Sequence, residues 1–116
     1  ACGQAATVCR APYGAITEEQ MAAVGKPFFM WSTDSLDWKL MDATADYNAV
    51  MNGDLTDGTI ILMHDIHKET VKSLDSVLQF LTSQGYSMVT VSESLGTNLN
   101  TQFVYYDQQS ATMPTQ

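Results

Sequence analysis

The sequence predicts an α/β fold made of parallel β-α-β units, and three observations lead to that class. First, short β-type runs alternate with segments of helical spacing, a pattern that favours a parallel sheet with right-handed crossovers. Second, residues 59–63 are almost wholly apolar, as in a parallel strand buried on both faces. Third, glycine or proline marks several of the segment boundaries, at Pro12, Gly25, Pro27, Gly53 and Gly85. The predicted strands are residues 7–10, 28–32, 59–63 and 87–91.

Each predicted helix has a start or stop signal. Residues 17–20 read TEEQ, which is the spacing of a capping box, and Gly25 follows that helix as its stop. A second helix is predicted at residues 45–52, ended by Gly53. The third helix has apolar residues three to four apart and ends at Gly85. Its apolar residues are Val71, Leu74, Leu78 and Leu81.

The composition limits the possible partners. The chain has 13 acidic and 5 basic residues, a net charge of −8, and 45% hydrophobic residues. Binding of nucleic acid or of an anionic membrane needs a basic surface, so neither is expected, whereas a neutral glycan tolerates this charge. No apolar run is long enough for a membrane span. Cys2 and Cys9 form a disulfide if a turn near Gly3 brings them together; otherwise Cys9 is a small buried residue of a strand.

Three short motifs follow predicted strands, in a fixed order. They are RAPYG at residues 10–14, DSLDW at residues 34–38 and LMHD at residues 62–65. The C-terminal ends of parallel strands meet at one rim, where α/β proteins place their chemistry. An isolated histidine such as His64 is more often structural, but its order with Asp37 and Arg10 favours a role as general acid, because imidazole titrates near neutral pH.

These motifs resemble motifs three to five of the polysaccharide deacetylases (the NodB homology domain, carbohydrate esterase family four), from about residue 7 to about residue 96. Periodicity alone does not separate a barrel from an open sheet; the resemblance implies roughly the second half of a distorted (β/α) barrel. It makes residues 1–96 the C-terminal part of a catalytic domain and residues 97–116 a polar tail. The family's first two motifs, which supply the base and the metal ligands, do not occur in the sequence. The resemblance therefore implies an N-terminal half outside this chain, upstream or on a separate nicked chain, and an inactive chain on its own.

The resemblance also implies four catalytic roles. His64 delivers a proton to the departing amine, and Asp37 supports the protonated imidazole. Arg10 orients the catalytic aspartate of the missing half. The backbone N–H of Tyr13 helps to hold the oxyanion, although a PYG sequence is by itself only a turn signal.

Two further residues are implied to bind the substrate, and none to bind metal. Trp38 and Leu62 match the pair that lines the pocket for the acetyl methyl group, and core packing is the alternative for both. His64 and His67 are three residues apart, but His67 begins a helix and no third ligand lies at zinc-like spacing. The implied cofactor, zinc or alternatively cobalt, is therefore expected to bind residues outside this chain.

The function expected from these residues is metal-dependent hydrolysis of N-acetyl groups on N-acetylglucosamine units of peptidoglycan or a chitin-like polymer. The alternatives are an O-acetyl xylan esterase of the same family and a non-catalytic glycan-binding α/β domain. The expected partners are the polysaccharide and the N-terminal half of the domain, and the expected location is secreted or at the cell surface. The sequence has no GxSxG motif of a serine hydrolase and no Gly-rich phosphate loop.

Overall fold

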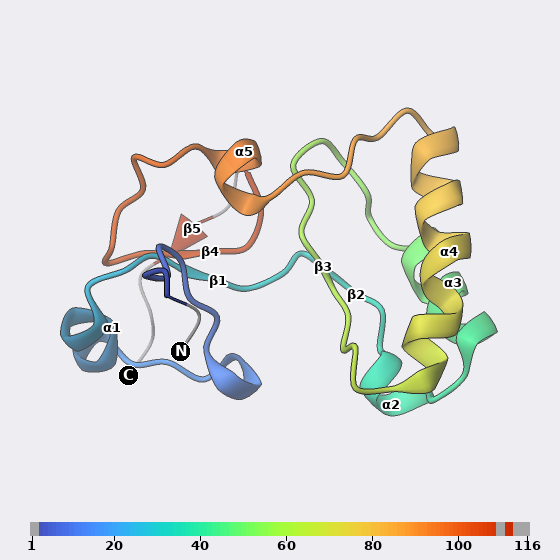
Figure 1. The fold of residues 1–116 in the computed structure, drawn as a ribbon, viewed down its shortest axis with the longest axis horizontal. Coiled ribbons are helices and arrows are strands. Elements are labelled where there is room, and N and C mark those ends of the chain that lie inside the picture. The colour runs from blue at the N-terminus through green and yellow to red at the C-terminus, as the bar shows by residue number, and fades with distance from the viewer. Residues whose placement is uncertain (1–2, 109–110, 113–116) are drawn as a thin grey trace.

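The computed structural model describes residues 3–108 and 111–112, and its first region is a small sheet beside one helix (Figure 1). The 3₁₀ turn η1 (Pro12–Gly14) precedes α1 (Glu18–Val24). Helix α1 has the predicted capping box: Thr17 Oγ1 accepts a hydrogen bond from Gln20 N, and Gln20 Oε1 accepts one from Thr17 N. The sheet has the order β1 (Phe28–Phe29), β4 (Val104–Tyr105), β5 (Ala111–Thr112); β1 and β4 are parallel, and β4 and β5 antiparallel.

The second region is a pair of parallel strands beside three helices. Strand β2 (Thr33–Asp34) pairs with β3 (Ile61–Leu62), so that Asp34 lies opposite Leu62. Helix α2 (Asp37–Leu40) follows β2, and α3 (Ala43–Met51) packs against α4 (Lys68–Ser83). A short helix, α5 (Val91–Leu95), lies between the two regions (Figure 1).

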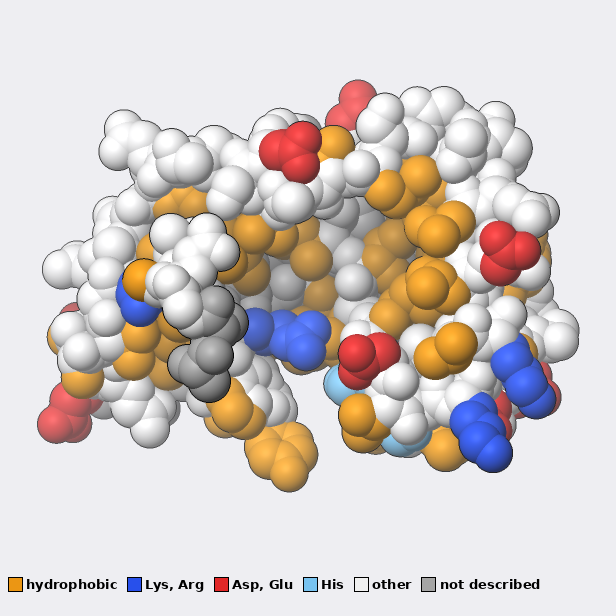
Figure 2. Space-filling model, viewed as in Figure 1, with side chains coloured by type: hydrophobic (Ala, Val, Ile, Leu, Met, Phe, Trp, Pro, Cys, Tyr) orange, Lys and Arg blue, Asp and Glu red, His pale blue; other side chains and the backbone are white. Residues whose placement is uncertain are grey.

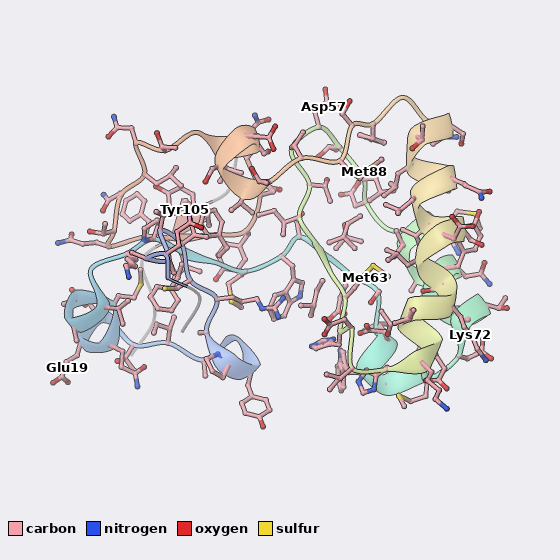
Figure 3. The ribbon with its side chains drawn as sticks, viewed as in Figure 1. Glu19, Asp57, Met63, Lys72, Met88 and Tyr105 are labelled. Atoms are coloured by element: carbon pink, nitrogen blue, oxygen red, sulfur yellow. The ribbon has the colours of Figure 1, made fainter. Side chains whose placement is uncertain are left out.

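Each region has its own apolar core. The buried residues of the first core come from the N-terminal segment, α1, β1 and β4, and those of the second from α3 and α4. The first core consists of Ala11, Met21, Phe28 and Val104, and the second of Val50, Val77 and Leu81. Met63, which follows β3, packs against the second core (Figure 3). This packing fixes α3 and α4 beside the ends of β2 and β3.

The predicted α/β class with parallel strands is confirmed, and the barrel half only in part. Within the described residues, the strands form two separate sheets rather than one continuous arc. Of the strand predicted at residues 28–32, only β1 (Phe28–Phe29) forms, and β2 begins at Thr33, just beyond the predicted range. The strand predicted at residues 7–10 is reduced to one parallel bridge between Cys9 and Phe28. Cys2 lies outside the described residues, and so does its predicted pairing with Cys9.

The predicted helices are present, but the last predicted strand is wrong. Residues 87–90 form no strand, and α5 begins at Val91. The reason is a second capping box, in which Thr90 Oγ1 accepts from Glu93 N and Glu93 Oε1 accepts from Thr90 N. The segment predicted as a polar tail, residues 97–116, contributes β4 and β5. No helix in the described part of the chain is long and apolar enough to cross a membrane.

Candidate active site

The parallel pairing of β2 and β3 brings two of the predicted site residues to one edge. Asp34 and Leu62 are opposite each other in the register, and the chain leaves both strands in the same direction. Asp37 comes three residues after the end of β2, and His64 comes two residues after the end of β3. The prediction that these strand ends meet at one rim is therefore confirmed for this pair.

Asp37 and His64 are joined by two hydrogen bonds. The Nδ1 atom of His64 lies 2.8 Å from Asp37 Oδ1, and the backbone N–H of His64 donates to Asp37 Oδ2. Asp37 is completely buried, whereas the His64 side chain keeps 31% of its surface exposed. The carboxylate therefore anchors the imidazole from the inside while the ring remains open to solvent.

Two more donors complete the environment of Asp37. Thr70 Oγ1, on the first turn of α4, donates to Asp37 Oδ2 at 2.7 Å. The backbone N–H of Trp38 donates to Asp37 Oδ1 at 2.8 Å. Each carboxylate oxygen of Asp37 thus has two hydrogen-bond partners. A buried charge needs such partners, because it has lost its contact with water.

The loop before Asp37 is held in an unusual conformation. Leu36 has a φ of 57°, in the left-handed region that a side chain other than glycine seldom adopts. Its backbone N–H donates to Asp34 Oδ1 at 2.8 Å, and Asp37 N lies 3.4 Å from the hydroxyl oxygen of the buried Ser35. These bonds hold the turn that directs the Asp37 carboxylate inward, and they give Asp34 a structural function.

The pKa of Asp37 lies below its ordinary value, as the result of opposing effects. Burial is the largest of them and by itself raises the pKa. The hydrogen bonds from the His64 ring, from the His64 backbone and from Thr70 lower it and together prevail. Asp37 is therefore ionised at neutral pH, and its partner Nδ1 carries the proton of their hydrogen bond. The Nε2 atom is then the ring nitrogen of His64 that Asp37 does not engage.

The two apolar site residues differ in exposure. Leu62 is buried in β3, which agrees with a packing function, while Trp38 is 52% exposed directly after Asp37. Trp38 therefore presents an open aromatic surface beside the His64–Asp37 pair, large enough to contact a bound ring.

Arg10 and Tyr13 are not bonded to this pair in the described part of the chain. Arg10 lines a hollow of about 300 Å³ together with Thr70 and Asp65, so it faces the side of α4 that holds Asp37. Figure 2 shows hydrophobic side chains on both sides of the hollowed centre of the molecule. Tyr13 has a φ of 59°, and its side chain is fully exposed. The structure therefore places His64, Asp37 and Trp38 together and leaves Arg10 and Tyr13 beyond hydrogen-bonding contact.

The sequence analysis missed Thr70 and Ser35. Thr70 is 33 residues away from Asp37 in the chain, and no local signal connects the two. Ser35 lies within the DSLDW motif, but a serine there is also typical of an ordinary turn.

The residues that the structure describes do not form a metal-binding site. They include no group of three or more His, Cys, Asp or Glu side chains placed to hold a metal ion. His64 and His67 lie with ring centroids 6.1 Å apart, but the Nδ1 of His64 is engaged by Asp37. These residues do not fit a catalytic metal.

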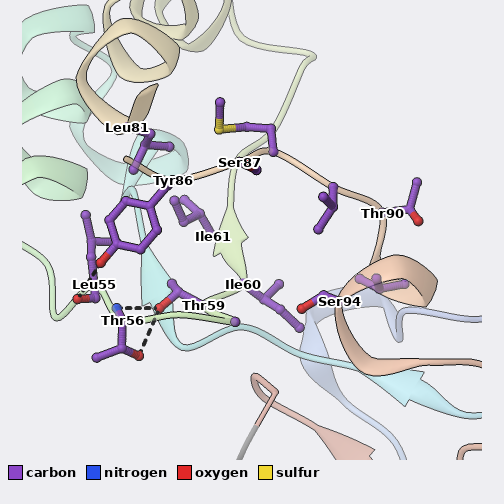
Figure 4. Close-up of a pocket in the computed structure, with 14 residues that line it drawn as sticks. Leu55, Thr56, Thr59, Ile60, Ile61, Leu81, Tyr86, Ser87, Thr90 and Ser94 are labelled. Carbon is purple, nitrogen blue, oxygen red and sulfur yellow. Dashed lines mark hydrogen bonds between the residues drawn. The ribbon is translucent and has the colours of Figure 1, made fainter. Parts of the chain in front are cut away.

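A second hollow, of about 320 Å³, lies at the other end of β3 (Figure 4). It is lined mainly by apolar side chains, and Thr56 N donates to Thr59 Oγ1 at its edge. Tyr86 Oη donates to Leu55 O beside it. Because it opens where β3 begins, it lies away from His64, which follows the end of that strand.

The fold and the site define an α/β protein with a buried carboxylate that orients a partly exposed imidazole at the end of a parallel strand pair. No family model matches the chain. The peptidoglycan-N-acetylglucosamine deacetylase PgdA of Listeria monocytogenes is 43% identical to it over 107 residues, which cover 92% of this chain and 23% of that protein. The peptidoglycan-N-acetylmuramic acid deacetylase PdaC of Bacillus subtilis is 36% identical over 91 residues, 78% of this chain and 19% of that protein.

A solved structure shows the same relationship. The family 4 acetyl xylan esterase from Clostridium thermocellum, in complex with a cobalt ion, matches with a TM-score of 0.81 and 27% identity, over 93% of this chain and 56% of that one. This chain is therefore a homologue, over most of its length, of the polysaccharide deacetylases of carbohydrate esterase family four. It spans about a quarter or less of the length of these two curated relatives.

Proposed function

We propose that this chain is the C-terminal portion of a deacetylase domain that removes N-acetyl groups from N-acetylglucosamine units of peptidoglycan or of a chitin-like polymer. The observation that carries the proposal is the bond between His64 Nδ1 and the buried Asp37, which prepares an exposed imidazole for proton transfer. The homology to two peptidoglycan deacetylases supports the substrate class.

In this proposal His64 supplies the proton that the departing amine requires. Amide hydrolysis releases a poor leaving group, so a general acid within reach lowers the barrier substantially. The ionised Asp37 keeps a proton on Nδ1, fixes the plane of the ring and favours the doubly protonated imidazolium by opposite charge. The proton that is transferred is the one on Nε2.

The other site residues act on the acetyl group and on the catalytic base. Arg10 orients the catalytic aspartate of the N-terminal portion by a forked, charge-assisted hydrogen bond. The backbone N–H of Tyr13 helps to hold the oxyanion. Trp38 and Leu62 line the pocket for the acetyl methyl group.

A divalent metal, zinc or cobalt, belongs to the proposal but not to this chain. The described residues do not hold it, and we place its ligands and the catalytic base on the N-terminal portion of the domain. Bound there, such a metal would supply Lewis-acid polarisation of the acetyl carbonyl and activation of a water molecule. The polymer substrate lies outside the cytoplasmic membrane, so we also propose a secreted or cell-surface location.

Two alternative functions are distinguished from this proposal by experiment. The likeness to an acetyl xylan esterase favours O-deacetylation of xylan as the second candidate. A non-catalytic glycan-binding domain would retain the Trp38 surface without the need for a functional His64–Asp37 pair.

The test compares His64→Gln with His67→Gln in the polypeptide that joins this chain to its N-terminal portion. His67, the residue directly before α4, is a matched control because it is the other histidine near the site. We expect His64→Gln to reduce acetate release from peptidoglycan by about 10²–10⁴-fold with unchanged metal content. The His67 variant should retain nearly the wild-type rate.

Three results would contradict this proposal. Loss of metal in the His64 variant would make His64 a ligand. Acetate release from xylan alone would favour the esterase. Glycan binding with no acetate release from any of these polymers would favour the non-catalytic domain.

A further inference from the structure

Asp46 is a completely buried carboxyl group without a hydrogen-bond partner for either oxygen among the described residues. It lies on α3, one turn before Val50, which is also completely buried and belongs to the apolar core. Buried carboxyl groups are nearly always paired, so an unpaired one in a folded protein calls for a functional explanation.

The surroundings of Asp46 are polar but give it no donor. The buried face of α4 begins with Thr70 and Ser73 and continues with apolar residues, and α3 packs against α4. The Thr70 hydroxyl is used by Asp37, and the Ser73 hydroxyl donates to the backbone oxygen of Thr70. Asp46 therefore shares a buried polar layer with Asp37, and neither of these two hydroxyls donates to it. Thr33 Oγ1, on the neighbouring β2, is likewise buried without a partner among the described residues.

The charged groups around Asp46 oppose its ionisation. Burial is the main cause that raises its pKa, followed by the negative charges of Asp37 on α2, of Asp42 before α3 and of Glu69 on α4, while His67 acts in the opposite direction. Asp34, on the neighbouring β2, is bound to the loop that follows it and offers no donor. Asp46 thus keeps its proton under conditions in which Asp37 is ionised.

We propose that Asp46 is a positioning residue that acts on His64 through Asp37, from the buried polar layer that the two carboxyl groups share. The neutral form leaves the buried layer with the single negative charge of Asp37. Release of the proton to solvent adds a second negative charge in the same buried layer, which favours retention of the His64 proton. His64 would then stay protonated to a higher pH than it would with Asp37 as the only buried negative charge. This role in catalysis rests on the proposed function, whereas the coupling itself does not.

The coupling is tested by NMR on the 116-residue chain with Asp46→Asn, and with Asp75→Asn as the control. Asp75 is an exposed α4 residue that accepts a bond from Gln79, a bond that asparagine retains. We expect the Asp46 carboxyl carbon to titrate above the ordinary aspartate value of 3.8. The ring signals of His64 should show an inflection at that same pH, which Asp46→Asn abolishes and Asp75→Asn preserves. Titration of Asp46 at or below 3.8, or the same inflection in the Asp46 variant, would overturn the proposal.

Unfolding measurements with Asp46→Leu give a second test. Leucine has no polar group, so this test does not depend on how the asparagine amide of Asp46→Asn is accommodated. A carboxyl whose native pKa is raised binds its proton more tightly in the folded state than in the unfolded state. Wild-type stability should therefore fall, relative to the variant, as the pH rises from the unfolded to the native pKa of Asp46. Parallel pH profiles would overturn the proposal. Absence of acetate release by the complete polypeptide would refute the proposed function and leave these two results to decide the coupling.

Discussion

Replacing Thr70 with valine removes one of the four hydrogen bonds that Asp37 accepts, at nearly constant side-chain shape. Thr70 is only 4% exposed, so water has little access to replace its hydroxyl. A hydrogen bond to a charged group contributes about 1.5–3 kcal/mol to stability. We expect Thr70→Val to lower the free energy of unfolding at pH 7 by that amount, about 1.5–3 kcal/mol.

The matched control is Thr70→Ser, which keeps the hydroxyl and loses a methyl group. Its cost comes from lost apolar burial, about 1 kcal/mol, and does not depend on pH. The cost of Thr70→Val does depend on pH. Because the native pKa of Asp37 is lowered, its stabilisation is complete above the unfolded value and is lost as the pH falls through the native one. The difference between wild type and Thr70→Val should therefore shrink in acid.

Urea-induced unfolding of the 116-residue chain between pH 7 and pH 3, followed by circular dichroism, measures both effects. The two variants separate a bond to the carboxylate from simple packing. A Thr70→Val cost equal to that of Thr70→Ser at every pH would refute the reasoning, since the hydroxyl would then contribute nothing to the ionised Asp37.

Two further predictions concern stability alone. Val50 is completely buried, and its replacement by alanine should lower the free energy of urea unfolding by about 2–3 kcal/mol. The control Val71→Ala, at a residue 57% exposed on α4, should change it by less than about 0.5 kcal/mol. Equal costs would contradict the placement of the core. Gly14 has a φ of +67°, and an added Cβ would lie 2.7 Å from Met30 Cε, whereas Gly25 has a similar φ of +68° with nothing within 4 Å. Both alanine variants should lose about 1–2 kcal/mol from the left-handed backbone, with the larger loss at Gly14. An equal loss at both positions would show that Met30 moves aside freely.

Local signals in the sequence were sufficient for α1, and the strand pattern together with the family resemblance indicated the Asp37–His64 pair. The capping box at Thr17 sets the start of α1, because one side chain satisfies an exposed backbone N–H and another returns the bond. Asp37 and His64 could be placed together because each follows a strand and parallel strands end at one edge. Neither inference required knowledge of the packing of distant segments.

Other features depend on contacts that the sequence does not encode locally. The segment at residues 87–91 has β-type residues, but the capping box at Thr90 starts α5 there. Asp46 was part of a predicted helix, where an aspartate is usually on the solvent side, and only the packing of α3 against α4 buries it. The pairing of β4 with β1 joins residues more than seventy positions apart, beyond the reach of any periodicity argument.

The source of the donors to Asp37 explains why the acid part of the site can form within this chain. All four hydrogen bonds come from described residues, namely Trp38, His64 twice, and Thr70 on α4. Each is fixed by an element that packs inside the second region, so no other polypeptide is needed to orient the imidazole. Arg10 and Tyr13, by contrast, are exposed and not bonded to the pair in the described residues, as expected of groups whose partners lie elsewhere. In the proposed deacetylase domain, this arrangement would hold the proton donor in place within this chain, and the N-terminal portion would supply the base and the metal ligands.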